Sequence, residues 1–193
     1  MKFRALAIIA ALALPTLAVA DDKTPPTDKT TDKTDKLSAD EVKIVAHLHH
    51  VNQMEIDVGK IAQKNGTAHV KSYSDTLEKD HKSADADLTA FAKKHGLKTL
   101  PTEKPDTDAA KQEQKDMTAQ VAHLKTLKGA EFDKEFLNMM VTGHEQEVAR
   151  IETSINTTSD QDFQTFLKSV KPMLQRHEDT ARDLQKSPQA STN

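Results

Sequence analysis

Apolar residues recur at alternating spacings of four and three over residues 38–65, which is the pattern of a helix with one buried face. Ser38 and Glu41 form an S-x-x-E capping box that predicts where this helix begins, and Asn65-Gly66 predicts where it ends. One polar residue interrupts the apolar stripe near the middle of the helix. The stripe consists of Ile44, Leu48, Val51, Glu55, Val58 and Ala62.

A second stripe predicts a helix from about residue 67 to residue 95, with Gly96 as its C-terminal stop. The same helical spacing is kept for seven steps, and the polar residue at its centre is a histidine. The stripe consists of Val70, Ser74, Leu77, His81, Ala84, Leu88, Phe91 and His95.

Three more helices are predicted after a proline-containing loop at residues 97–106. The first, at about 107–127, is short and has a weak apolar face. The other two are long and run over about 131–155 and 160–186. Pro172 lies inside the last helix, where a proline removes one backbone hydrogen bond, so this helix is expected to kink or to split in two.

The order of these elements predicts an all-α fold, because no alternating strand pattern and no hairpin turn appears. Two tight helical hairpins flank a connection of about 35 residues that contains the short helix, which at 1.5 Å per residue is about 30 Å long. This connection is long enough to return the chain along most of a bundle. The predicted architecture is therefore a ferritin-like antiparallel four-helix bundle with an extra short helix in the long crossover.

Glu55, His81, His144 and His177 each interrupt the apolar stripe of a different long helix. In the predicted topology they lie within roughly 10 Å of one another along the bundle axis. Each buried polar group without a partner would cost about 1–3 kcal/mol, so the four must meet one another, water or a metal ion. The sequence leaves two alternatives open, which are a metal site and a hydrogen-bonded layer that is structural or titrates with pH.

A ligand set of imidazoles and a carboxylate would suit zinc, copper, iron or manganese. Glu78-x-x-His81 matches half of the motif of carboxylate-bridged di-iron proteins. The second half is missing, because no glutamate stands three residues before His144 or His177, so a full di-iron oxidase site is not expected. Glu147, three residues after His144, is a secondary candidate for a carboxylate ligand together with Glu78.

Two methionines offer a further option, since Met140 and Met173 each stand one turn before a histidine of the polar layer. Thioether and imidazole ligands together suit Cu(I). Methionine also fills gaps in apolar cores, which is its more common use. Met140 and Met173 are therefore secondary candidates.

Three other histidines cluster on the first predicted helix at His47, His49 and His50. They are interpreted as surface residues. His50 lies on the side of the helix that carries Val51, and it could approach the polar layer from there.

The N-terminal residues 1–20 read as a secretory signal peptide, with a basic start, an apolar run and a small-x-small cleavage site that ends at Ala20. The Asp/Lys/Thr/Pro-rich residues 21–37 cannot form a core and are expected to be a disordered tether. The bundle should occupy residues 38–186, and a frayed tail should follow at 187–193. An exported protein, periplasmic or secreted, is expected, and because the chain has no cysteine it has neither a lipoprotein anchor nor disulfides.

Charge and composition narrow the classes of partner. Removing Lys2 and Arg4 from the 27 basic residues leaves 25 against 30 acidic ones, a net charge of −5 without a basic stripe, so nucleic acid is not an expected partner. No segment of the mature chain is long and apolar enough to span a bilayer. Neither a nucleophile elbow nor a phosphate-binding glycine-rich loop is visible, so no enzymatic machinery is predicted. An envelope protein or a second copy of the chain stays open as a partner.

Several short motifs occur in a fixed order along residues 38–186. They are Asn52-x-x-Glu55 with Gly59-Lys60-Ile61-Ala62, then Asp80-His81, then Phe132-Asp133-x-x-Phe136-Leu137 leading to His144, and Pro172 followed by His177. In these motifs the chain resembles the domain-of-unknown-function family 4142 (DUF4142), whose members are often labelled exported or outer-membrane proteins. The resemblance implies a ferritin-like helical bundle in an exported bacterial protein, and it implies no activity.

Two functions follow as hypotheses. The first is an exported helical bundle that binds a transition metal through Glu55, His81, His144 and His177, for metal buffering or in an envelope stress response. The alternative is a non-catalytic interaction module of the cell envelope, whose Glu/His layer is structural or responds to pH because histidine titrates near neutrality.

Overall fold

The computed structural model describes residues 36–187, and within this range it contains helices and no strands. The prediction of an all-α fold is thereby confirmed. Most helix ends lie within about three residues of the ends that the apolar stripes and caps predict. The helices are α1 (Ala39–Asn65), α2 (Ala68–Lys94), α3 (Asp108–Leu124), α4 (Gly129–Thr157) and α5 (Gln161–Lys186).

Local hydrogen bonds set the start of α1 as the sequence predicts. The Ser38 hydroxyl accepts from the backbone N–H of Glu41 (3.3 Å), and the Glu41 carboxylate accepts from the backbone N–H of Ser38 (2.8 Å). This reciprocal pair satisfies two of the backbone donors that a helix start leaves without partners. The turn between α1 and α2 is fixed from α4, because the buried Asp133 carboxylate accepts from the backbone N–H of Thr67 (3.0 Å).

Pro172 does not split the last helix. Splitting was one of the two outcomes expected from the sequence, and a kink was the other. α5 runs without interruption from Gln161 to Lys186. Leu167 and Leu174, on either side of the proline, are both buried in the same apolar cluster. Their packing holds both turns against the core, although the proline removes one backbone hydrogen bond between them.

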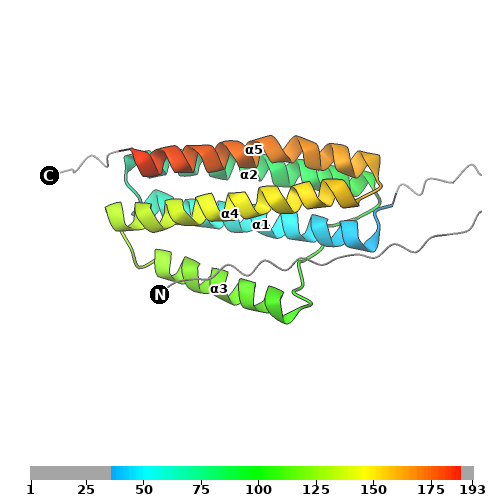
Figure 1. The fold of residues 1–193 in the computed structure, drawn as a ribbon, viewed down its shortest axis with the longest axis horizontal. Helices are drawn as coiled ribbons and strands as arrows, with labels where there is room; N and C mark the ends of the chain where they lie inside the picture. The colour runs from blue at the N-terminus through cyan, green and yellow to red at the C-terminus, as the bar shows by residue number, and fades with distance from the viewer. Residues whose placement is uncertain (1–35, 188–193) are drawn as a thin grey trace, which may run out of the picture. The chain divides into compact units, whose positions relative to one another are not determined.

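The four long helices lie side by side, and α1 packs mainly against α2 while α4 packs mainly against α5 (Figure 1). The two hairpins meet where α2 contacts α5 and where α1 contacts α4. The short helix α3 contacts α4 from outside, and only its last residue, Leu124, is buried. The connection before it begins at Gly96, whose φ of +87° favours glycine.

The apolar core consists of two clusters, one toward each end of the helices. The cluster that includes Val58, Leu77 and Phe136 lies near the α1–α2 turn, and the cluster that includes Leu48, Leu88 and Phe163 lies near the α4–α5 turn. On each long helix the predicted polar residue falls between the residues that belong to one cluster and those that belong to the other. The polar residues therefore divide the core into two parts.

Within residues 36–187, no helix combines the length and the apolar character that crossing a membrane requires. The predicted signal peptide, residues 21–35 of the predicted tether and residues 188–193 of the predicted tail lie outside the described residues. Leu37, which directly precedes the cap of α1, packs against the apolar cluster around Leu48 and Phe163.

Candidate metal centre

Three imidazoles from three helices meet in the middle of the core. His81 of α2, His144 of α4 and His177 of α5 are 0%, 2% and 2% exposed. Each offers one ring nitrogen, and these three atoms all lie within 4.8 Å of one another. We call His81, His144 and His177 the histidine triad.

The other nitrogen of each triad ring lies at hydrogen-bonding distance from an oxygen atom. The three contacts are His81 Nδ1 to Asn52 Oδ1 (2.9 Å), His144 Nδ1 to Met140 O (2.8 Å) and His177 Nε2 to Asp80 Oδ2 (3.0 Å). Because a carbonyl or a carboxylate oxygen only accepts, these nitrogens must be the ones that carry the hydrogen in a neutral ring. The three contacts thus fix both the orientation and the tautomer of each imidazole, as oxygen partners do for metal-ligating histidines.

The three remaining ring nitrogens are buried and have no hydrogen-bond partner among the described residues. They are His81 Nε2, His144 Nε2 and His177 Nδ1. In the tautomers set by the oxygen partners, each of these nitrogens carries a lone pair. Three atoms no more than 4.8 Å apart have a common point within about 2.8 Å of each, so shifts of less than about 1 Å would bring them to the 2.0–2.1 Å of a Zn–N bond.

Burial favours the neutral form of two of these imidazoles, His81 and His177. The pKa of His81 is well below its ordinary value, first because of burial and then because of the nearby rings of His144 and His177. Burial also lowers the pKa of His177 to about 4, although Asp80 partly opposes this change. The neutral form is the one that binds a metal ion, so near neutral pH His81 and His177 are in the protonation state that ligation requires.

Glu55, the fourth residue of the predicted layer, lies beside the triad. It does not belong to the group of residues whose potential ligand atoms lie within 4.8 Å of one another. It is 4% exposed, and its Oε2 has no hydrogen-bond partner within residues 36–187. Burial raises the pKa of its carboxyl group, His144 lowers it and Glu147 raises it further. The structure therefore brings together three of the four predicted residues and places the fourth close enough to His144 to interact electrostatically.

The secondary candidates lie in different surroundings. Glu78 pairs with Lys82 (2.9 Å) and packs against Gly59, while Met173 packs against the cluster around Leu48 and Phe163. Met140 is fully buried and contacts His144 through its carbonyl oxygen. Metal ligation by any of these side chains, and by the triad, stays a prediction.

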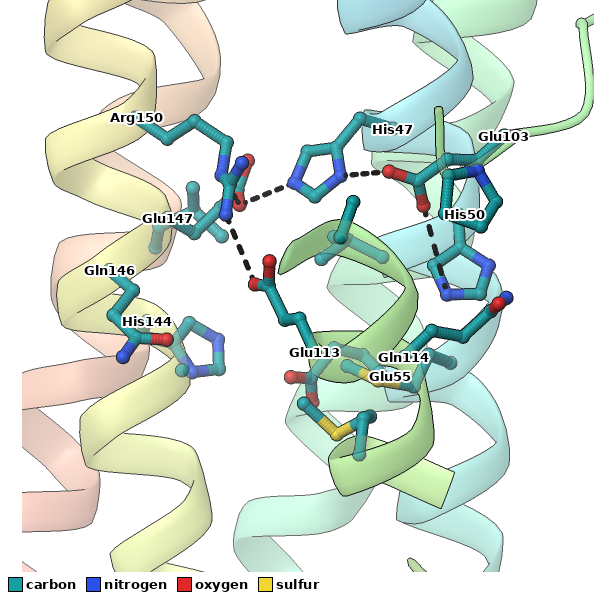
Figure 2. A pocket seen from close by; sticks show the side chains of 17 residues that line it. His47, His50, Glu55, Glu103, Glu113, Gln114, His144, Gln146, Glu147 and Arg150 are labelled. Atoms are coloured by element: carbon teal, nitrogen blue, oxygen red, sulfur yellow. Dashed lines mark hydrogen bonds and ion pairs between the residues drawn. The ribbon is translucent and has the colours of Figure 1, made fainter. Parts of the chain in front are cut away.

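A cavity of about 150 Å³ reaches the centre from the side that α3 covers (Figure 2). Its buried part contains Glu55, His144 and Glu147, and its exposed part contains Glu113 and Arg150. Helices α1 and α4 form its walls, and α3 with residues before it forms its cover. Of the triad, His144 lines this cavity, so the cavity reaches the site at this imidazole.

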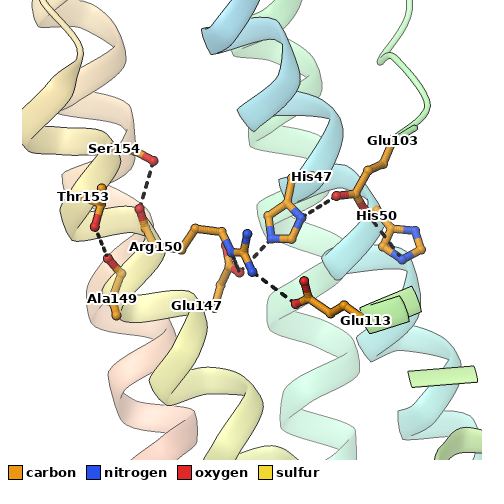
Figure 3. A network of polar contacts seen from close by, with 9 residues as sticks. All are labelled: His47, His50, Glu103, Glu113, Glu147, Ala149, Arg150, Thr153 and Ser154. Carbon is orange, nitrogen blue, oxygen red and sulfur yellow. Dashed lines mark hydrogen bonds and ion pairs between the residues drawn. The ribbon is translucent and has the colours of Figure 1, made fainter. Parts of the chain in front are cut away.

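His47 lies at this cavity and not on the open surface, which corrects the expectation from the sequence. Its Nδ1 lies 2.8 Å from Glu103 Oε1 and its Nε2 lies 2.9 Å from Glu147 Oε2 (Figure 3). These two carboxylates raise the pKa of His47 to about 9 against the effect of burial, which is the largest single influence and lowers it. His47 also lowers the pKa of Glu103.

Arg150 extends the same network toward solvent (Figure 3). It lies 3.6 Å from Glu147 and 3.2 Å from Glu113 of α3. The ion pairs of His47 and Arg150 thus connect the cover of the cavity to α1 and α4. Nothing in the local sequence around His47 indicates this role, because Glu103 and Glu147 are distant in the chain.

An all-helical chain with three converging buried imidazoles does not by itself define a family. The family model described as "Domain of unknown function (DUF4142)" matches residues 26–184, and the chain belongs to this family. This confirms the resemblance seen in the sequence motifs. No curated protein and no solved structure is significantly similar to the chain.

Proposed function

We propose that this protein is an exported, ferritin-like helical bundle that binds one transition-metal ion at the histidine triad. The observation that carries the proposal is the difference between the two nitrogens of each triad imidazole. One nitrogen of each ring is held by an oxygen, the other is buried without a partner, and each ring offers one nitrogen within 4.8 Å of those offered by the other two rings. A purely structural layer would leave three buried acceptors unpaired, each at a cost of about 1–3 kcal/mol.

The donor set favours ions of borderline character. Imidazole suits zinc, copper, iron and nickel, and three imidazoles leave at least one coordination position for water or another ligand. Glu55 is the side chain best placed to complete or neutralise the site, since it lies next to His144 with an unpaired carboxyl oxygen. The two hairpins and the long connection that contains α3 support the ferritin-like arrangement.

The role proposed for this site is buffering of a metal ion in the cell envelope or protection against metal-related stress. The predicted signal peptide at residues 1–20 supports an exported location. No nucleophile or phosphate-binding loop accompanies the site within residues 36–187, so we propose binding and not turnover.

Metal analysis of protein purified without a metal-affinity tag tests this function. About one ion for each chain is expected, and it should be lost from the variants His81→Ala and His144→Ala. His49→Ala is the matched control, because His49 pairs with Asp85 on the same bundle but lies outside the triad. Metal-free protein whose stability does not change on addition of zinc, copper, iron or manganese would refute the proposal.

One observation favours the alternative of a structural, pH-responsive layer in an interaction module. His81, through Asn52, and His177, through Asp80, already have side-chain partners that would orient them without a metal ion. In that case His81→Leu and His144→Leu should fold normally, and wild-type protein and variants should bind metal equally poorly.

A further inference from the structure

We propose that the cavity under α3 is the path by which a divalent cation reaches the histidine triad, and that Glu147 with Glu55 forms a transfer site for the ion on this path. This inference rests on the proposed metal-binding function. It adds a second, transient cation site made of carboxylate oxygens to the imidazole site.

Two buried carboxyl groups with unpaired oxygens line the cavity. Glu147 is 7% exposed, and its Oε1 has no hydrogen-bond partner within residues 36–187 although its Oε2 binds His47. Glu55 is equally buried, and its Oε2 is also unpaired. The two groups line the same cavity. A divalent cation between them would satisfy both oxygens and remove their mutual repulsion.

The charge around the cavity also favours a cation. Four carboxyl groups line it, and the positively charged side chains of His47 and Arg150 face them together with the imidazole of His50. Both cations are engaged in ion pairs with these same carboxylates. The carboxyl groups outnumber these side chains, and an excess of negative charge in a cleft raises the local concentration of cations and the rate at which they bind. The four carboxyl groups belong to Glu55, Glu103, Glu113 and Glu147.

The size of the cavity fits a partly hydrated ion. A volume of about 150 Å³ corresponds to about five water molecules at about 30 Å³ each. Carboxylate oxygens readily replace water around a divalent cation, whereas the three imidazoles would bind the ion after it has lost more of its water. These groups all line one cavity, so an ion held by the carboxylates would lie in the same cavity as His144 (Figure 2).

The opposite side of the triad is less suited to a cation. A groove between α2 and α5 reaches His177 there, but Tyr73 and Asp80, which line it, already have hydrogen-bond partners. The Tyr73 hydroxyl donates to the backbone carbonyl of His177 (2.9 Å), and Asp80 accepts from the His177 ring. Arg176 adds a positive charge to this groove, which repels an incoming cation.

Cobalt(II) provides a probe, because its visible absorption changes when imidazoles replace water. The purified full chain is stripped of metal, mixed rapidly with cobalt(II), and the absorption is followed with time. Glu147→Gln removes the charge of the transfer site and keeps its shape. Gly143→Leu narrows the cavity, because Gly143 lines it, and the added Cβ would meet no atom within 4 Å.

Two matched controls accompany these variants. Glu145→Gln makes the same charge change on an exposed part of α4, where Glu145 pairs with Arg182 outside the cavity. Ser72→Leu places the same side chain in the opposite groove. Glu147→Gln and Gly143→Leu should each slow cobalt uptake about tenfold or more and reach the wild-type final spectrum, while both controls stay within about twofold of wild type.

Three results would overturn the inference in different ways. If the two cavity variants take up cobalt as fast as the controls, the proposed path is wrong and the proposed metal site is unaffected. If Ser72→Leu is slow and Gly143→Leu is not, the ion enters between α2 and α5. If the wild-type protein takes up no cobalt, the proposed function and the path fail together.

Discussion

The stability of the metal-free protein should peak near pH 6.5, because His47 and His177 respond to pH in opposite directions. On the alkaline side the relevant residue is His47, whose pKa rises from its ordinary value of 6.5 to about 9 between Glu103 and Glu147. Its protonated form is favoured in the folded protein, so its contribution is complete below about pH 6.5 and is lost as the pH rises through about 9. At about 1.4 kcal/mol for each pH unit, the rise in pH from 6.5 to about 9 lowers the free energy of unfolding by about 3 kcal/mol.

On the acid side the relevant residue is His177. Burial lowers its pKa from 6.5 to about 4, so the unfolded chain takes up a proton in this interval and the folded protein does not. Stability is therefore lost as the pH falls from about 6.5 toward 4, again by about 3 kcal/mol. His81, whose pKa is also lowered, acts in the same direction.

Urea denaturation followed by circular dichroism, with a chelator present, measures this profile between about pH 4 and pH 10. His47→Gln should flatten the alkaline side and leave the acid side unchanged. His177→Gln should reduce the slope of the acid side only. A His47→Gln variant that loses stability above pH 6.5 as steeply as the wild-type protein would show that the bridge between Glu103 and Glu147 does not stabilise the fold.

Two further predictions concern single positions. Asp80→Leu should weaken zinc binding roughly 10–100-fold in a competition titration, because it removes the oxygen that orients a triad imidazole, whereas Asp85→Leu should not. Gly143→Ala should stabilise the protein by about 0.5–1 kcal/mol in thermal or urea unfolding, since the added methyl group meets open space in the middle of a helix. Gly59→Ala is the contrasting case and should not show this gain, because its Cβ would lie 2.8 Å from the Glu78 side chain.

The helices could be predicted from the sequence because their signals are local. The capping box at Ser38 and Glu41, the stop at Gly96 and the apolar stripes all act within a few residues of chain. Pro172 shows the limit of such signals. A proline predicts the loss of one hydrogen bond, but the packing of the helix on both sides decides whether the helix continues, and this packing depends on the other helices.

The residues of the candidate site could be predicted from the sequence, but the hydrogen bonds of their ring nitrogens could not. A histidine on an apolar stripe signals burial, and this was enough to find His81, His144 and His177. Which ring nitrogen is held and which is left without a partner depends on Asn52 and Asp80, and their positions relative to the rings are set by the packing of whole helices. The contacts of His47 with Glu103 and Glu147 could not be predicted. They join α1, α4 and the connection before α3, and the proximity of these segments depends on the path of the long connection.

The division of the long helices into two hairpins has a consequence for how the molecule opens. Each hairpin contacts itself far more extensively than it contacts the other, so the interface between the hairpins is the natural plane of partial unfolding. His81 belongs to one hairpin, and His144 and His177 belong to the other. A bound ion would therefore link the two hairpins across this plane. In hydrogen exchange, the metal-free hairpins should open as separate cooperative units, and the loaded protein should exchange its core amides as one.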